Sequence, residues 1–175
     1  MTLILSNYIL YSQHPQPTDP TIYCPLVWDL RESPASSARH VSNLQRSLSS
    51  RELSQPASFP SVSSLTITCN LFPDTWSIQA ENAIYVTVHD VLHAIYTSLY
   101  MPLKREEWDS LSRRQHDLVQ SAFERRCRNA INPEECAAAG KMRIDYLAHH
   151  IIFGGLSASL EDENTCILSL RRLPA

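Results

Sequence analysis

The stretch Val86–Tyr100 (VTVHDVLHAIYTSLY) most constrains the fold, because it joins a strand pattern directly to a helix pattern. Ile84–Thr87 is apolar and β-branched, which favours a strand. Thr87 with Asp90 three residues later is typical of a capped helix start. The helix should end before Pro102, because the residue preceding a proline disfavours helical geometry. Helical spacing predicts one buried face, formed by Val88, Val91, Leu92, Ile95 and Leu99.

Alternating patterns elsewhere predict a sheet around this helix. The turn chemistry of Phe72–Thr75 separates two alternating runs, which predicts a hairpin that continues through Ile84–Thr87 as a three-strand meander. Further strands are expected at Cys24–Arg31, in the second part of Met142–Phe153 after a turn, and at Thr165–Leu173. Helical patterns follow at 104–111 and 113–129. Together they predict an α+β fold: a mostly antiparallel sheet with two to three helices packed on one face, in a single domain.

The length of 175 residues suits one domain, with two peripheral segments. Residues 1–23 are expected to form an N-terminal arm or edge strand, and residues 24–175 the α+β domain. Residues 32–64 are rich in serine and proline, which indicates a surface excursion. Within it, residues 38–53 carry a helical spacing, but serines compete for backbone hydrogen bonds, so the sequence leaves this helix open.

Composition excludes several classes of protein. Eighteen acidic residues outnumber fifteen basic ones, so no nucleic-acid partner is expected. No apolar run reaches the roughly 20 residues of a membrane helix, and the first residues lack the pattern of a signal peptide. The only glycines are Gly140, Gly154 and Gly155, so no P-loop, dinucleotide-binding turn or nucleophile elbow can be built, and no cofactor is predicted. Five cysteines without a CxxC pair favour a reduced, cytoplasmic location.

Several short motifs together resemble those of one family. They are WDLR at 28–31, VTVHDVL at 86–92, EEW at 106–108, AFERRC at 122–127, RIDYL at 143–147 and FGGL at 153–156. This combination is similar to an uncharacterised fungal family with a domain of unknown function, abundant in mushroom-forming fungi. The resemblance covers most of residues 24–172. It implies a fungal intracellular protein with an α+β domain, and it implies no activity, cofactor or catalytic residue.

The first candidate site is a histidine pair on the central helix. His89 and His93 are spaced i, i+4, which lets two imidazoles share a metal ion. Alternatively, they simply flank the buried stripe. A metal site would need a further ligand, for which the candidates are Asp145, His149 and His150.

The second candidate comprises two charged pairs. Asp29 with Arg31 and Arg143 with Asp145 are each spaced i, i+2, so on neighbouring strands the four side chains would cross-pair. As function, such a cluster would anchor an anionic ligand through the arginine forks. As structure, it would be a buried ion-pair network that fixes the register, which is the simpler interpretation.

Three further features are candidates for chemistry. The arginines at 113, 114, 125, 126 and 128 would bind phosphate or an acidic partner, but interleaved acids are typical of a solvated, salt-bridged face. Cys127 lies beside two arginines, as a catalytic thiolate would, although its place in a helical stripe indicates burial. Tyr146 and His149 remain candidates for general acid–base catalysis.

The leading hypothesis is therefore a non-catalytic binding module that contacts a protein partner through the serine-rich excursion or the arginine-rich helix. The alternative is a small nucleotide-independent enzyme, an isomerase, cyclase or hydrolase, with a pocket lined by His, Asp and Tyr. Under this enzyme hypothesis, the protein would bind a small-molecule ligand, and a metal ion could assist the reaction. A pocket joining His89 or His93 to Asp145, Tyr146 or His149 would favour the enzyme. Self-association through an uncovered edge strand is a third hypothesis.

Overall fold

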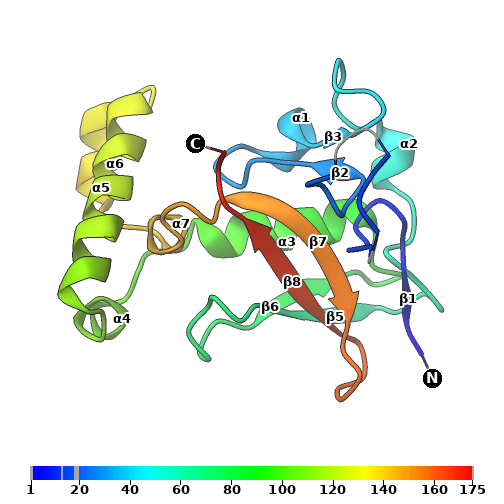
Figure 1. Cartoon of the computed structure of the whole chain (residues 1–175). Coiled ribbons are helices and arrows are strands. Elements are labelled where there is room, and N and C mark those ends of the chain that lie inside the picture. Colours follow the sequence, from blue (N-terminus) through cyan, green and yellow to red (C-terminus); the bar gives the residue numbers. More distant parts are fainter. Residues whose placement is uncertain (1, 13, 18–19, 175) are drawn as a thin grey trace.

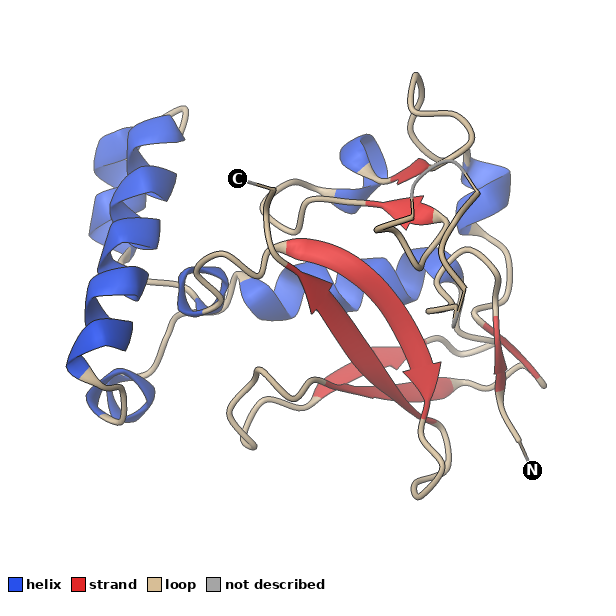
Figure 2. Ribbon diagram, viewed as in Figure 1, coloured by secondary structure: helices blue, strands red, loops and turns tan. Residues whose placement is uncertain are grey.

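A four-stranded sheet runs through the fold in the order β6-β5-β8-β7 (Figures 1 and 2). Its strands are β5 (Ser64–Thr68), β6 (Ile78–Glu81), β7 (Ile152–Ala158) and β8 (Thr165–Arg171). The pairs β5–β6 and β7–β8 are antiparallel, whereas β5 and β8 are parallel. This computed structural model describes residues 2–12, 14–17 and 20–174. The α+β class and the hairpin are confirmed, with Leu65 opposite Ala80.

Helix α3 (Val88–Leu99) packs against this sheet and buries the predicted stripe. Its N-cap is a full capping box: Asp90 N donates to Thr87 Oγ1 over 3.1 Å, and Thr87 N donates to Asp90 Oδ2 over 2.8 Å. The expected strand over Ile84–Thr87 is wrong. Asn82 Oδ1 accepts from Ile84 N, which turns the chain away from β6 and leaves Ile84 82% exposed.

The serine-rich residues 32–64 contribute one strand to each of two small two-stranded sheets and form two single-turn helices. Strand β1 (Ile4–Leu5) pairs with β4 (Ser58–Phe59), and β2 (Leu26–Val27) pairs with β3 (Arg39–His40). The sequence leaves open whether residues 38–53 form a helix. In the structure only the end of this range, Ser50–Leu53, is helical. The strand expected at Cys24–Arg31 is reduced to β2. The two helices are α1 (Pro34–Ser37) and α2 (Ser50–Leu53).

Four helices follow α3, and two of them stand apart from the sheet. They are α4 (Arg105–Asp109), α5 (Arg113–Asn129), α6 (Pro133–Ala139) and α7 (Arg143–Tyr146). Figure 1 shows α5 and α6 side by side at one end of the molecule, with α7 between them and α3. In the described residues, no helix is both long and apolar enough to cross a bilayer. Helices α4, α5 and α6 therefore form a helical unit joined to the rest of the domain chiefly through α7.

Candidate functional site

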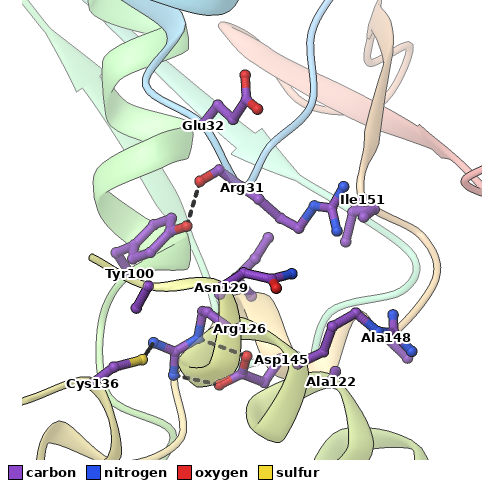
Figure 3. A pocket seen from close by; sticks show the side chains of 13 residues that line it. Arg31, Glu32, Tyr100, Ala122, Arg126, Asn129, Cys136, Asp145, Ala148 and Ile151 are labelled. Carbon is purple, nitrogen blue, oxygen red and sulfur yellow. Dashed lines mark hydrogen bonds and ion pairs between the residues drawn. The ribbon is translucent and has the colours of Figure 1, made fainter. Parts of the chain in front are cut away.

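A cavity of about 450 Å³ lies where α5 meets the rest of the domain (Figure 3). Its polar lining comes from three distant parts of the chain: Arg31 after β2, Arg125 and Arg126 in α5, and Asp145 in α7. Its apolar lining comes from small and aliphatic side chains, namely Ala122, Ala130, Ile144, Ala148 and Ile151. A volume in this range and a mixed lining are typical of ligand pockets.

Asp145 links α5 to the start of α7 at one end of the cavity. Its carboxylate accepts two hydrogen bonds from Arg126, from Nε over 2.9 Å and from Nη2 over 2.8 Å. The same carboxylate accepts from Met142 N over 2.8 Å at the start of α7. Arg126 also donates to Gly140 O and to Cys136 Sγ. The hydrogen bonds to Asp145 raise the pKa of Arg126 above its usual range, so this ion pair is fixed and fully occupied.

A second ion pair forms the opposite wall. Arg31 donates from Nε and Nη2 to the Asp29 carboxylate, the shortest distance being 2.6 Å. The hydrogen bond to Asp29 raises the pKa of Arg31. Tyr100, at the end of α3, donates its hydroxyl to Arg31 O over 2.6 Å, and burial raises the pKa of Tyr100 to about 12. Tyr100 therefore stays neutral and fixes the Arg31 backbone.

These pairs leave two guanidinium groups with unused donors. Within the described residues, Arg125 has no carboxylate partner, and Arg31 Nη1 makes no hydrogen bond. Figure 3 shows the carboxylate of Glu32 pointing away from the Arg126–Asp145 pair. Both other carboxylates near the cavity, of Asp29 and Asp145, are already paired. Arg125 thus presents its guanidinium to the cavity without a paired carboxylate, and Glu32 lines the same cavity outside any ion pair of the described residues.

The predicted four-charge network does not form. Arg31, which is paired with Asp29, lines one cavity together with the pair Asp145–Arg126, but Arg143 points elsewhere. Residues 143 and 145 lie in helix α7 rather than on a strand, so a spacing of two sends their side chains in different directions. Arg143 instead donates to Ser98 Oγ over 3.1 Å and stacks on Trp76, 4.8 Å from the ring centroid.

The histidines lie outside the cavity. The rings of His89 and His93 stack at 5.5 Å on α3. Among the described residues, no group of three His, Cys, Asp or Glu side chains is placed to hold a metal ion. His149 interacts through its carbonyl, which accepts from Leu173 N. Tyr146 packs edge-on against Trp76 at 5.0 Å.

The cysteine candidate is not set up as a nucleophile. Cys127 is buried and its thiol donates to Cys136 Sγ over 2.9 Å. Burial, followed by this contact with Cys136, raises the pKa of Cys127 to about 11. A thiol with such a pKa stays protonated near neutral pH, whereas a reactive cysteine needs the thiolate.

Sequence reasoning placed Arg125 and Arg126 on a solvated face and missed that Arg126 is the partner of Asp145. The local signal was present, because these arginines sit in the last turns of a long helix whose cysteine predicts a buried side. The partner was hidden, since Arg126 and Asp145 are nineteen residues apart and belong to different helices. The role of Tyr100 in holding Arg31 depends on the tertiary structure, because the two residues are 69 positions apart in the chain.

Comparison with known proteins identifies the family. No curated protein and no solved structure matches the chain. A family model matches residues 26–165, which is well over half of the chain and includes every residue that contributes a charge to the cavity. The chain therefore belongs to DUF6699, a family of unknown function.

Proposed function

We propose that this chain is a non-catalytic binding module whose cavity accepts an acidic side chain of a protein partner. The observation that carries the proposal is Arg125, a cavity-lining arginine without a carboxylate partner in the described part of the chain. A guanidinium in a partly desolvated pocket gains more from a bidentate carboxylate than one on an open surface. An incoming carboxylate would therefore complete the charge pairing of the cavity.

Two further features support this proposal. The apolar walls, such as Ile144 and Ile151, suit the methylene groups of a glutamate side chain. Three of the motifs on which the family resemblance rests also meet there: WDLR supplies Arg31, AFERRC supplies Arg125 and Arg126, and RIDYL supplies Asp145. A small-molecule carboxylate would use the same groups, and the fungal and intracellular origin implied by the resemblance remains a prediction.

The enzyme alternative finds less support in this geometry. It requires a histidine or a free carboxylate next to the ligand. No histidine lines the cavity within the described residues, and the lining carboxylate of Glu32 points away from the Arg126–Asp145 pair (Figure 3). Asp145 accepts three hydrogen bonds and is 2% exposed, so it is not available as a general base. Neither His89 nor His93 shares a cavity with Asp145, Tyr146 or His149. Binding is thus the function that the geometry supports best.

The test uses a short peptide with one glutamate between glycines, blocked at both ends so that it carries no other charge. Titration of the wild-type protein by calorimetry at low salt should show saturable binding. Arg125→Gln should weaken this binding about tenfold, because it removes one charge-assisted contact worth about 1.5 kcal/mol. The matched control is Arg128→Gln, an exposed arginine of the same helix that does not line the cavity.

A peptide with glutamine in place of glutamate separates charge from shape. The wild type should bind this glutamine peptide at least tenfold more weakly than the glutamate peptide. Arg125→Gln should bind the glutamine peptide as weakly as the wild type does. Equal affinities of the two peptides for the wild type would contradict the proposal. So would an equal loss in Arg125→Gln and Arg128→Gln, since that would indicate non-specific attraction to a basic helix.

A further inference from the structure

A groove of about 490 Å³, which shares no lining residue with the cavity, runs between the free edge of the sheet and one face of α3. Strand β6 is an edge strand, because β5 is its only partner among the strands of the described residues. One wall of the groove is the strand segment Ser77–Glu81. The other wall is a continuous face of α3, formed at helical spacing by Asp90, His93, Ala94, Thr97 and Ser98.

The backbone of β6 presents unused hydrogen-bonding groups to this groove. Asn82 N donates to Ser63 O on the β5 side, and successive residues of a strand alternate in direction. The N–H and C=O groups of Gln79 and Glu81 therefore point outward, away from β5. Within the described residues these groups have no hydrogen-bond partner. An edge of this kind is a template for a further strand.

Arg143 provides a second, independent indication of a ligand. It lines the end of the groove where β6 begins, is only 7% exposed, and its Nε has no hydrogen-bond partner. Carboxylates that would neutralise it are occupied: Asp145 pairs with Arg126, and Glu107 accepts from Trp76 Nε1 and Lys104 N. A buried guanidinium without a counter-ion is costly, so this position favours an incoming carboxylate.

The opposite end of the groove carries the opposite charge. Asp90 lies beside the end of β6, because its carboxylate accepts from Asn82 Nδ2 over 2.9 Å. Its hydrogen bonds outweigh the effect of burial and lower the pKa of Asp90, so it is ionised at neutral pH. The strand from Ser77 to Glu81 separates the two ends by about 13 Å, which corresponds to four residues of extended chain. The groove is therefore basic at the start of β6 and acidic at its end.

We propose that this groove binds an extended segment of a partner protein, which adds to β6 as an antiparallel strand. Antiparallel pairing places the N-terminal end of the segment near Asp90 and its C-terminal end near Arg143. Side chains i, i+2 and i+4 of a strand share one face, so a basic residue, a small apolar residue and an acidic residue would all face α3. The segment has the pattern basic–x–apolar–x–acidic. This proposal is independent of the cavity at Arg125.

The probe is a blocked pentapeptide, acetyl-Lys-Thr-Val-Thr-Glu-amide. Binding should slow amide hydrogen exchange of Gln79 and Glu81 in the wild-type protein, because their outward N–H groups become bonded. Gln79→Pro removes one of these donors and should abolish binding, whereas Gln79→Ala keeps the N–H and should bind as the wild type does. Both variants lose the same side-chain contacts to Thr66 and Ser77, so their comparison isolates the backbone.

Peptide variants test the charges without altering the fold. The reversed peptide, with glutamate first and lysine last, and the peptide with glutamine in place of glutamate should each bind about tenfold more weakly. Equal binding of the reversed peptide, or full binding by Gln79→Pro, would overturn the proposal. Analytical sedimentation tests the remaining possibility, that a second copy of this chain occupies the groove. A free protein that is dimeric, with Gln79 and Glu81 amides already protected, would show that a second copy fills the groove.

Discussion

At the scale of single residues, Asp145 determines how the helical unit is attached to the sheet. Its two oxygens accept from Arg126 in α5 and from the backbone of Met142 in front of α7. The carboxylate is 2% exposed and the Arg126 side chain 16% exposed, so water contributes little to their solvation. A buried pair of this kind fixes geometry, and removal of one partner leaves the other charge uncompensated.

Asp145→Asn should therefore destabilise the protein by about 3–5 kcal/mol. Chemical denaturation, followed by circular dichroism, measures the loss. Asp29→Asn is the control, because its pair with Arg31 is partly exposed and should cost only about 1 kcal/mol. Equal losses in the two variants would show that the Arg126–Asp145 pair is not buried as described.

The stability of the protein should also fall at high pH because of Tyr100. Burial raises the pKa of Tyr100 to about 12, whereas in the unfolded chain it is about 10. The folded state thus favours the neutral phenol, so this contribution is fully present below pH 10 and is lost between about pH 10 and 12. Urea midpoints between pH 8 and 12 should fall less steeply in Tyr100→Phe than in the wild type. Parallel curves would contradict this role.

At the scale of elements, the sequence was informative wherever the signal was local. The stripe and the Thr87–Asp90 box of α3 lie within fifteen residues, so both the helix and its buried face were predictable. The position of α5 was not predictable, because its helical pattern does not reveal whether it packs against a sheet or against another helix. The cavity depends on that position. The cross-paired network expected from spacing on strands does not form, because residues 143–146 are helical and Asp145 pairs with Arg126 instead.

The α3 capping box provides a test at this scale. Thr87→Ala removes the acceptor of Asp90 N and should cost about 1 kcal/mol of stability. Thr97→Ala, at an exposed position of the same helix, should change stability by less than about 0.5 kcal/mol. Thermal or urea denaturation distinguishes the two. A neutral Thr87→Ala would mean that helix α3 does not depend on this N-cap.

The attachment of the helical unit makes a second prediction for elements. In α5 only Val119 and Cys127 are buried, whereas α3 buries five apolar side chains. Local unfolding free energy follows such burial, so α5 and α6 should open at a lower free energy than α3. Native-state hydrogen exchange should show faster exchange in 113–139 than in 88–99. Uniform exchange across both regions would indicate a single cooperative unit.

At the scale of the whole molecule, the first residues belong to the domain rather than extending from it. Leu5 and Ile9 are buried, Ser6 N donates to Ala57 O, and Leu156 N donates to Ile9 O. This segment crosses β7 at Gly155, whose φ of +106° favours glycine. A Cβ at this position would lie 2.9 Å from both Cα and N of Tyr11. This contact cannot be predicted from sequence patterns, because its partners are far apart in the chain.

Gly155→Ala should cost about 3 kcal/mol or more, because backbone strain adds to the clash with the N-terminal segment. Gly140→Ala is the matched control. It also has a positive φ, of +80°, but no atom lies within 4 Å of a Cβ there, so only strain of about 1–2 kcal/mol is expected. Denaturation midpoints compare the two. A smaller loss in Gly155→Ala would contradict the close crossing.

The central claim, that the arginine-lined cavity binds an acidic side chain, is tested most directly by locating the bound glutamate peptide. A ¹⁵N–¹H shift map of the wild-type protein during titration would do this. The account predicts that the largest shifts cluster around the cavity, at Asn129, Ala130, Ala148 and Ile151, and are much smaller in Arg125→Gln at the same peptide concentration. Shifts confined to the outer face of α5, or unchanged in Arg125→Gln, would contradict it.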